Sequence, residues 1–119
     1  MYKVRITVMK RTVHQDLIDR FELPQENPCE MEIGQSFIVE GDNKPEGLCE
    51  SAWETLRPFV IGLENGEQGF YGDWMKDPRS AMLSCNDGFR PVSFLIEAIK
   101  DDDMILIFIN FFLYFVFLV

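Results

Sequence analysis

An abrupt change of composition after residue 103 constrains the fold of this chain more than any other feature. Three aspartates, Asp101–Asp103, precede a segment, residues 104–119, in which only Asn110 and Tyr114 are polar. The residues before it have the mixed composition of a globular protein, and their number leaves room for one hydrophobic core. We therefore expect a single domain over residues 1–100, followed by an acidic spacer and apolar tail over residues 101–119.

Residues 104–119 are open to several interpretations. As a helix they would span ~24 Å, less than the ~30 Å of a hydrocarbon core, and no basic residue follows them. A membrane anchor would therefore need a thinned bilayer. The alternatives are a last buried strand or helix, packed on the domain or on a second copy, and an extension without a selected role. Membrane contact and a homo-oligomer through this segment both stay open.

The charge of the chain argues against one class of partner. Twenty acidic and 11 basic residues give a formal net charge of −9. The longest basic run is Lys10–Arg11, so no patch is evident that would hold nucleic-acid phosphates, and no nucleic-acid partner is expected. The N-terminus lacks the pattern of a secretory signal, and three cysteines without a close pair do not suit a disulfide-stapled secreted domain. A cytoplasmic location is expected, or a membrane-associated one if the tail is an anchor.

Hydrophobic periodicity predicts an α+β fold. Residues 2–9 alternate as a half-buried strand does, whereas residues 14–21 have helical spacing with Thr12 as a candidate cap. A turn at Gly34 leads into a short strand that ends at Gly41. Apolar residues then recur at helical spacing from Pro45 to about Leu63.

Two further features complete the predicted fold. Pro58 should kink or end the longer helix near Arg57, because proline removes a backbone hydrogen bond. Residues 64–80 read as a long aromatic loop, and residues 81–99 as a β-hairpin around Asp87-Gly88. The expected architecture is a small antiparallel sheet with one short and one longer helix, plus the apolar C-terminal segment.

The cysteines are the main candidates for chemistry. Cys29, Cys49 and Cys85, together with the lone His14, would make a complete Cys₃His ligand set for zinc, and iron is the other metal that such thiolates would suit. Their separations of 20 and 36 residues lack the close cysteine pair of most structural zinc sites. The competing interpretation is that they are small apolar fillers, and Cys49 lies on the helical stripe beside Trp53.

Cys85 is the better candidate for a reactive thiol. It stands at the end of the predicted hairpin, and Arg90 is close enough in sequence to favour a thiolate. A nucleophilic cysteine needs a base, and His14 is the one histidine in the chain, so the first helix would have to meet this hairpin. The cofactor, like the reaction, is not identified by the sequence.

The aromatic loop over residues 69–78 supplies a second hypothesis, a non-enzymatic module that binds a ligand or a protein partner and that the apolar tail could tether to a membrane. Residues 73–78 mix aromatic, cationic and anionic side chains, as binding sites and well-capped turns both do. No phosphate loop, nucleophile elbow or His-Glu-x-x-His motif occurs, so the common enzyme classes lack their usual support. Ligand or partner contacts are predicted for six residues: Trp53, Tyr71, Trp74, Lys76, Asp77 and Arg90.

Four segments together resemble a family of short, uncharacterised bacterial and archaeal proteins. They are residues 2–12 (YKVRITVMKRT), 47–53 (GLCESAW), 74–78 (WMKDP) and 85–92 (CNDGFRPV). The resemblance covers nearly all of residues 1–99 and excludes the tail. It implies cysteines at the positions of Cys29, Cys49 and Cys85, sometimes with another where this chain has Ser84, and therefore a thiol or metal role. A cysteine-based metal-binding or thiol redox domain is the leading hypothesis.

Overall fold

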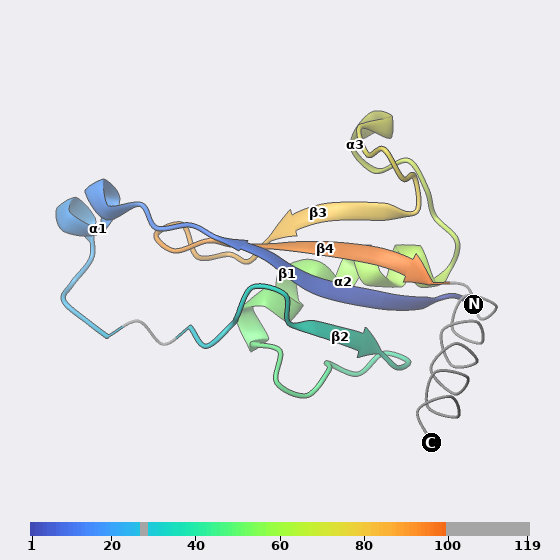
Figure 1. Ribbon diagram of the computed structural model, residues 1–119, viewed down its shortest axis with the longest axis horizontal. Helices are drawn as coiled ribbons and strands as arrows, with labels where there is room; N and C mark the ends of the chain where they lie inside the picture. The colour runs from blue at the N-terminus through green and yellow to red at the C-terminus, as the bar shows by residue number, and fades with distance from the viewer. Residues whose placement is uncertain (27–28, 100–119) are drawn as a thin grey trace, which may run out of the picture.

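The structure is a computed structural model that describes residues 1–26 and 29–99, and it confirms the α+β fold (Figure 1). A four-stranded antiparallel sheet has the order β2-β1-β4-β3. The elements run β1 (Lys3–Arg11), α1 (Gln15–Phe21), β2 (Ser36–Val39), α2 (Glu50–Glu64), α3 (Phe70–Asp73), β3 (Ser80–Ser84) and β4 (Val92–Ile99).

The two long central strands, β1 and β4, confirm the alternating patterns of the sequence. Ile6 lies opposite Ile96 and Val8 opposite Phe94, and all four side chains are almost fully buried. Neighbouring residues point to the other face, where Arg5 pairs with Glu97 at 3.1 Å. A sheet with one covered face needs side chains that alternate in this way.

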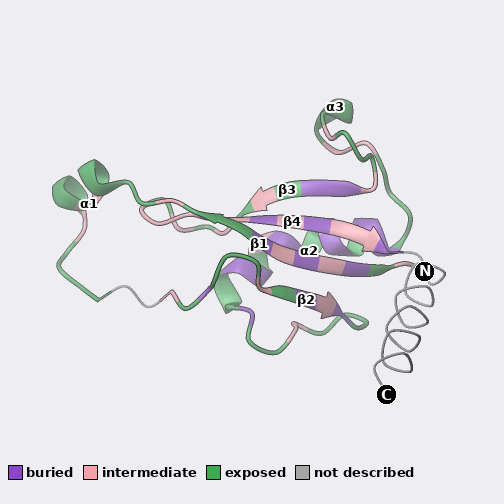
Figure 2. Ribbon diagram, in the orientation of Figure 1, coloured by how far each residue is buried: buried purple, intermediate pink, exposed green. Residues whose placement is uncertain are grey.

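Helix α2 covers one face of the sheet and completes the core (Figure 2). Its buried residues Ala52, Leu56, Val60 and Leu63 recur every three or four positions, as the helical period requires. Each fully buried leucine, such as Leu56 or Leu63, stabilises the fold by roughly 2 kcal/mol through the apolar surface removed from water. Burial falls on the strands and on α2, whereas α1 and α3 are largely exposed.

Helix α2 begins later than predicted, and it does not end at the predicted position. Gly47, with a φ of 88°, and a turn that bonds Leu48 to Pro45 occupy the expected first turn, so the helix begins only at Glu50. The expected stop near Arg57 is wrong, since the helix runs through Pro58 to Glu64. Pro58 lies on the exposed side, and the buried residues of the helix on both sides of it hold the helix on the sheet.

Helix α1 lies at one end of the molecule, and its cap differs from the prediction. Its N-cap is His14 and not Thr12, whose backbone N–H donates to the carbonyl of Pro91. No residue of α1 is buried, and Phe21 is 64% exposed. The helix is held by polar contacts with the β3–β4 connection, as described below.

Residues 27–28 and 100–119 lie outside the described part of the chain. The interpretations of the apolar tail, and the domain boundary near residue 100, therefore stay predictions. Over residues 1–26 and 29–99, no helix has the length and apolar character that crossing a membrane requires.

Candidate functional site

All three cysteines line one pocket, although 20 and 36 residues separate them in sequence. The pocket has a volume of about 450 Å³, within the range of small-molecule sites. We call it the thiol pocket. Its lining residues come from three segments and are Cys29, Glu30, Met31, Gly47, Leu48, Cys49, Glu50, Ser51, Cys85, Asp87, Arg90, Val92 and Phe94.

Cys49 belongs to the wall formed by the N-terminus of α2. It is the N-cap residue, with extended backbone angles, and its side chain is exposed. Its Sγ lies 3.5 Å from the hydroxyl oxygen of Ser51. The expectation that Cys49 packs in the apolar stripe of the helix beside Trp53 is wrong, because the helix starts one residue later and the neighbouring Leu48 is the buried residue.

Cys85 belongs to a second wall, at the end of β3. Its backbone N–H donates to the carbonyl of Val92 at 3.0 Å, and its Sγ accepts the N–H of Val92 at 3.3 Å. The residue is half-buried and packs against the core. Both its backbone and its sulfur are therefore fixed by the strand opposite.

Cys29 belongs to the third wall, in a segment without regular secondary structure. It is half-buried against the core, next to the buried Met31. The guanidinium of Arg11 approaches the carbonyl oxygen of Cys29 at 3.5 Å. All three cysteines are thiols, and none forms a disulfide.

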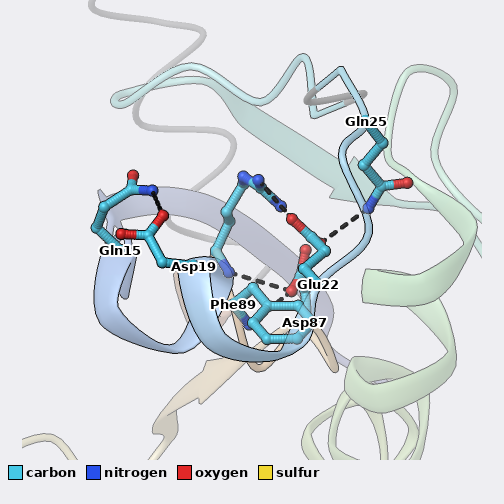
Figure 3. Close-up of polar contacts among 7 residues, drawn as sticks. Gln15, Asp19, Glu22, Gln25, Asp87 and Phe89 are labelled. Carbon is cyan, nitrogen blue, oxygen red and sulfur yellow. Dashed lines mark hydrogen bonds and ion pairs between the residues drawn. The ribbon is translucent and has the colours of Figure 1, made fainter.

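Arg90 lies at the same pocket, but its charge is already paired. Its two terminal nitrogens donate to the two carboxylate oxygens of Glu22 at 2.7 and 3.0 Å, and both side chains are at most 14% exposed (Figure 3). The hydrogen bond from Arg90 lowers the pKa of Glu22, and the bond to Glu22 in turn raises the pKa of Arg90. Arg90 therefore ties α1 to the β3–β4 connection, and its guanidinium is engaged by the carboxylate of Glu22.

Asp87 stabilises the β3–β4 connection through hydrogen bonds to its backbone. Its Oδ1 accepts the backbone N–H groups of Phe89 and Arg90 at 2.8 and 3.1 Å, which holds a tight turn (Figure 3). The N–H of His14 donates to the carbonyl of Phe89, so the first helix does meet the hairpin, as a Cys–His pair would need. The side chain of His14 is exposed, however, and does not line the thiol pocket.

The pocket does not have the geometry of the Cys₃His site. Within residues 1–26 and 29–99, no three His, Cys, Asp or Glu side chains are placed to hold a metal ion. The structure thus brings the three predicted thiols to one pocket without arranging them as a ligand set. A zinc or iron site stays a prediction.

The aromatic residues gather at a second place, beside the edge strand β3. Trp74 is 81% exposed, and its ring lies 6.1 Å from that of Tyr71. Together with Met75 and Met82 they surround a hollow of about 350 Å³, which we call the aromatic surface. Tyr71 adopts a φ of 58°, a left-handed conformation that is uncommon for a residue with a bulky side chain.

The other predicted contact residues lie outside the thiol pocket and the aromatic surface. Trp53 is buried in the core beneath the sheet. Asp77 accepts the backbone N–H of Arg79 at 2.9 Å and so holds a turn, while Lys76 is exposed on the same segment. Of the six residues, Tyr71 and Trp74 belong to the aromatic surface, and Arg90 to the thiol pocket.

Sequence reasoning missed the residues that build the thiol pocket around the cysteines. Met31, Leu48 and Phe94 supply its apolar lining, and they carry no signal apart from hydrophobicity. Glu22 was also missed, because its partner Arg90 lies 68 residues away. Comparison of the chain with protein-family models, curated proteins and solved structures finds no match, so the resemblance described above stays a prediction.

Proposed function

We propose that this chain is a small thiol redox domain, in which cysteines of the thiol pocket form a disulfide reversibly when a small oxidant enters. One observation carries the proposal: three cysteines that are distant in sequence line a single pocket. Cysteines used only as apolar fillers are scattered through a core. Here one of the three, Cys49, is exposed at the N-terminus of a helix.

The lining of the pocket also supports a thiol function. Apolar side chains of Met31, Leu48 and Phe94 would bind the body of a small molecule, while the sulfurs face its reactive part. In the described part of the chain no three ligands are placed to hold one metal ion, an arrangement that favours redox chemistry over a shared metal site. Soft thiol sulfur serves both roles, so the choice between them follows from the arrangement of the thiols.

The test is a thiol titration of the intact chain under native conditions. Diamide is added to the reduced protein, the remaining thiols are alkylated, and the intact mass counts them. We expect two thiols to be lost within one chain and regained with dithiothreitol. Three thiols that persist in the native protein, or a disulfide that forms only between chains, would overturn the proposal. Stoichiometric zinc or iron in anaerobically purified protein would favour the metal site instead.

A second candidate function is supported by the exposure of Trp74. Large aromatic side chains dominate binding surfaces, and a left-handed tyrosine beside an exposed tryptophan is a strained arrangement often found at such sites. We propose, as the alternative, that the aromatic surface mediates self-association of the chain.

Sedimentation velocity of the full chain tests this alternative. Trp74→Ala should shift a self-associating population toward the monomer, whereas Leu23→Ala, which removes another highly exposed apolar side chain, should leave it unchanged. A wild-type chain that stays monomeric at all concentrations would contradict it.

A further inference from the structure

We infer that the three cysteines divide the redox work: Cys49 attacks a small uncharged disulfide, Cys29 resolves the mixed disulfide, and Cys85 is structural. The inference rests on the proposed redox function and adds to it the role of each thiol and the class of substrate.

The attacking role falls to Cys49 because the substrate disulfide must reach the attacking sulfur along the line of its own S–S bond, which requires an exposed thiol. Cys49 is the exposed member of the three, whereas Cys29 and Cys85 are half-buried against the core.

Cys85 is a poor partner for Cys49 because its sulfur is already used. Its Sγ accepts the N–H of Val92, and its own N–H donates to the carbonyl of Val92. A disulfide at Cys85 would have to turn the sulfur away and leave the N–H of Val92 unpaired. A half-buried N–H without an acceptor costs on the order of 1 kcal/mol or more.

Cys29 is the better partner because its backbone can adjust. A disulfide requires the two Cα atoms to be about 4.4–6.8 Å apart with a defined dihedral, so one backbone must usually shift. Cys49 is the N-cap of a 15-residue helix, and Cys85 is hydrogen-bonded to Val92 through both its backbone and its sulfur, whereas Cys29 lies in a segment without regular secondary structure. The segment of Cys29 is thus the wall of the pocket that can approach Cys49.

The substrate class follows from the lining. Met31, Leu48 and Phe94 are apolar, and the charged lining residues Glu30, Glu50 and Asp87 are acidic, while Arg90 is paired with Glu22. A disulfide that carries carboxylates would be repelled by these acidic groups, and Arg90, which is already paired, would not offset the repulsion. A small uncharged disulfide avoids that repulsion.

The reaction balances in two exchange steps. The Cys49 thiolate attacks one sulfur of the disulfide R–S–S–R; its S–S bond breaks, a Cys49–S–S–R bond forms, and R–S⁻ leaves and takes up a proton. The Cys29 thiolate then attacks the sulfur of Cys49, and the second R–S⁻ leaves and is protonated. Two cysteine thiols are oxidised to one disulfide, and the substrate disulfide is reduced to two thiols.

The experiment treats the reduced full chain with 2-hydroxyethyl disulfide and maps the products by mass spectrometry. The wild type should form a Cys29–Cys49 disulfide without a lasting adduct, and Cys85→Ser should behave in the same way. Cys29→Ser should keep one hydroxyethylthio adduct on Cys49. Cys49→Ser should react about tenfold more slowly, because the remaining thiols are half-buried. Thermal unfolding of each variant confirms that it is folded.

The outcomes separate this inference from the proposed function. If Cys29→Ser forms a Cys49–Cys85 disulfide, or Cys85→Ser accumulates the adduct, the division of roles is wrong while the redox function stands. If the native wild type forms no intramolecular disulfide with this reagent or with diamide, both fall.

Discussion

Two hydroxyl groups cover the outer edge of strand β3, and we predict that removing them lowers the stability of the fold and promotes aggregation. The bonds between Cys85 and Val92 and between Ala98 and Arg79 mark the bonded pairs of the β3–β4 ladder, so the alternate residues Ser80, Met82 and Ser84 direct their backbone groups outward. The hydroxyl of Tyr71 donates to the carbonyl of Met82 at 2.8 Å. The hydroxyl of Thr55 is shared between the carbonyl of Ser84 at 3.1 Å and that of Ala52, in its own helix, at 2.9 Å.

The double variant Thr55→Val and Tyr71→Phe removes both donors and changes little else in shape. The Thr55–Ser84 and Tyr71–Met82 bonds are both exposed, so water replaces each lost bond and each loss should cost about 0.5 kcal/mol. For a domain of this size a total of about 1 kcal/mol lowers the midpoint of thermal unfolding by roughly 4–8 °C. The uncovered carbonyls should also promote strand addition between copies and hence aggregation.

Circular dichroism melting and light scattering below the midpoint measure the two effects. Thr7→Val with Tyr2→Phe is the matched control, because it makes the same two chemical changes at hydroxyls that form no hydrogen bond with another described residue. The reasoning is refuted if the double variant melts and scatters like the control.

Three further predictions concern pH. Burial, and secondarily Asp42, raise the pKa of Glu64, so the folded state loses stability as the pH rises above 4.5; Glu64→Gln should be more stable than the wild type at neutral pH, with no such gain in acid. The hydrogen bond from Arg90 lowers the pKa of Glu22, so its stabilisation is present above pH 4.5 and is lost as the pH falls through the lowered pKa; Glu22→Gln should be less stable at neutral pH, and the difference should close in acid. Burial raises the pKa of Tyr71, so the wild type should lose stability relative to Tyr71→Phe as the pH rises above 10.0. Urea unfolding over the pH range tests all three, and a pH-independent difference would contradict each.

The sheet was predictable because its signal is local. Strands β1 and β4 each bury every second side chain under α2, and that period of two is visible in their sequences. The start of α2 was not predictable from the sequence. Leu48 lies in a turn before the helix, but it is buried and its position also fits the apolar stripe of the helix. Pro58 misled for a related reason: its effect depends on whether tertiary contacts hold the helix on both sides.

The thiol pocket lies beyond what local patterns show. The sequence identified Cys29, Cys49 and Cys85 as the candidates, but their meeting depends on how segments 20 and 36 residues apart come together on the sheet. It also favoured Cys85 as the reactive thiol because of Arg90, whereas the structure pairs Arg90 with Glu22. The exposure of Cys49 follows from the helix boundary that the sequence had misplaced.

Crosslinking with dibromobimane, a short bifunctional alkylating reagent that fluoresces strongly only when both arms have reacted with thiols, tests the convergence of the cysteines most directly. Native protein should become fluorescent within one chain, with peptide mapping placing the crosslink between Cys49 and another cysteine of the thiol pocket, and Cys49→Ser should reduce the signal. Single-arm adducts alone in the native chain, or a crosslink that appears only after unfolding, would contradict the account.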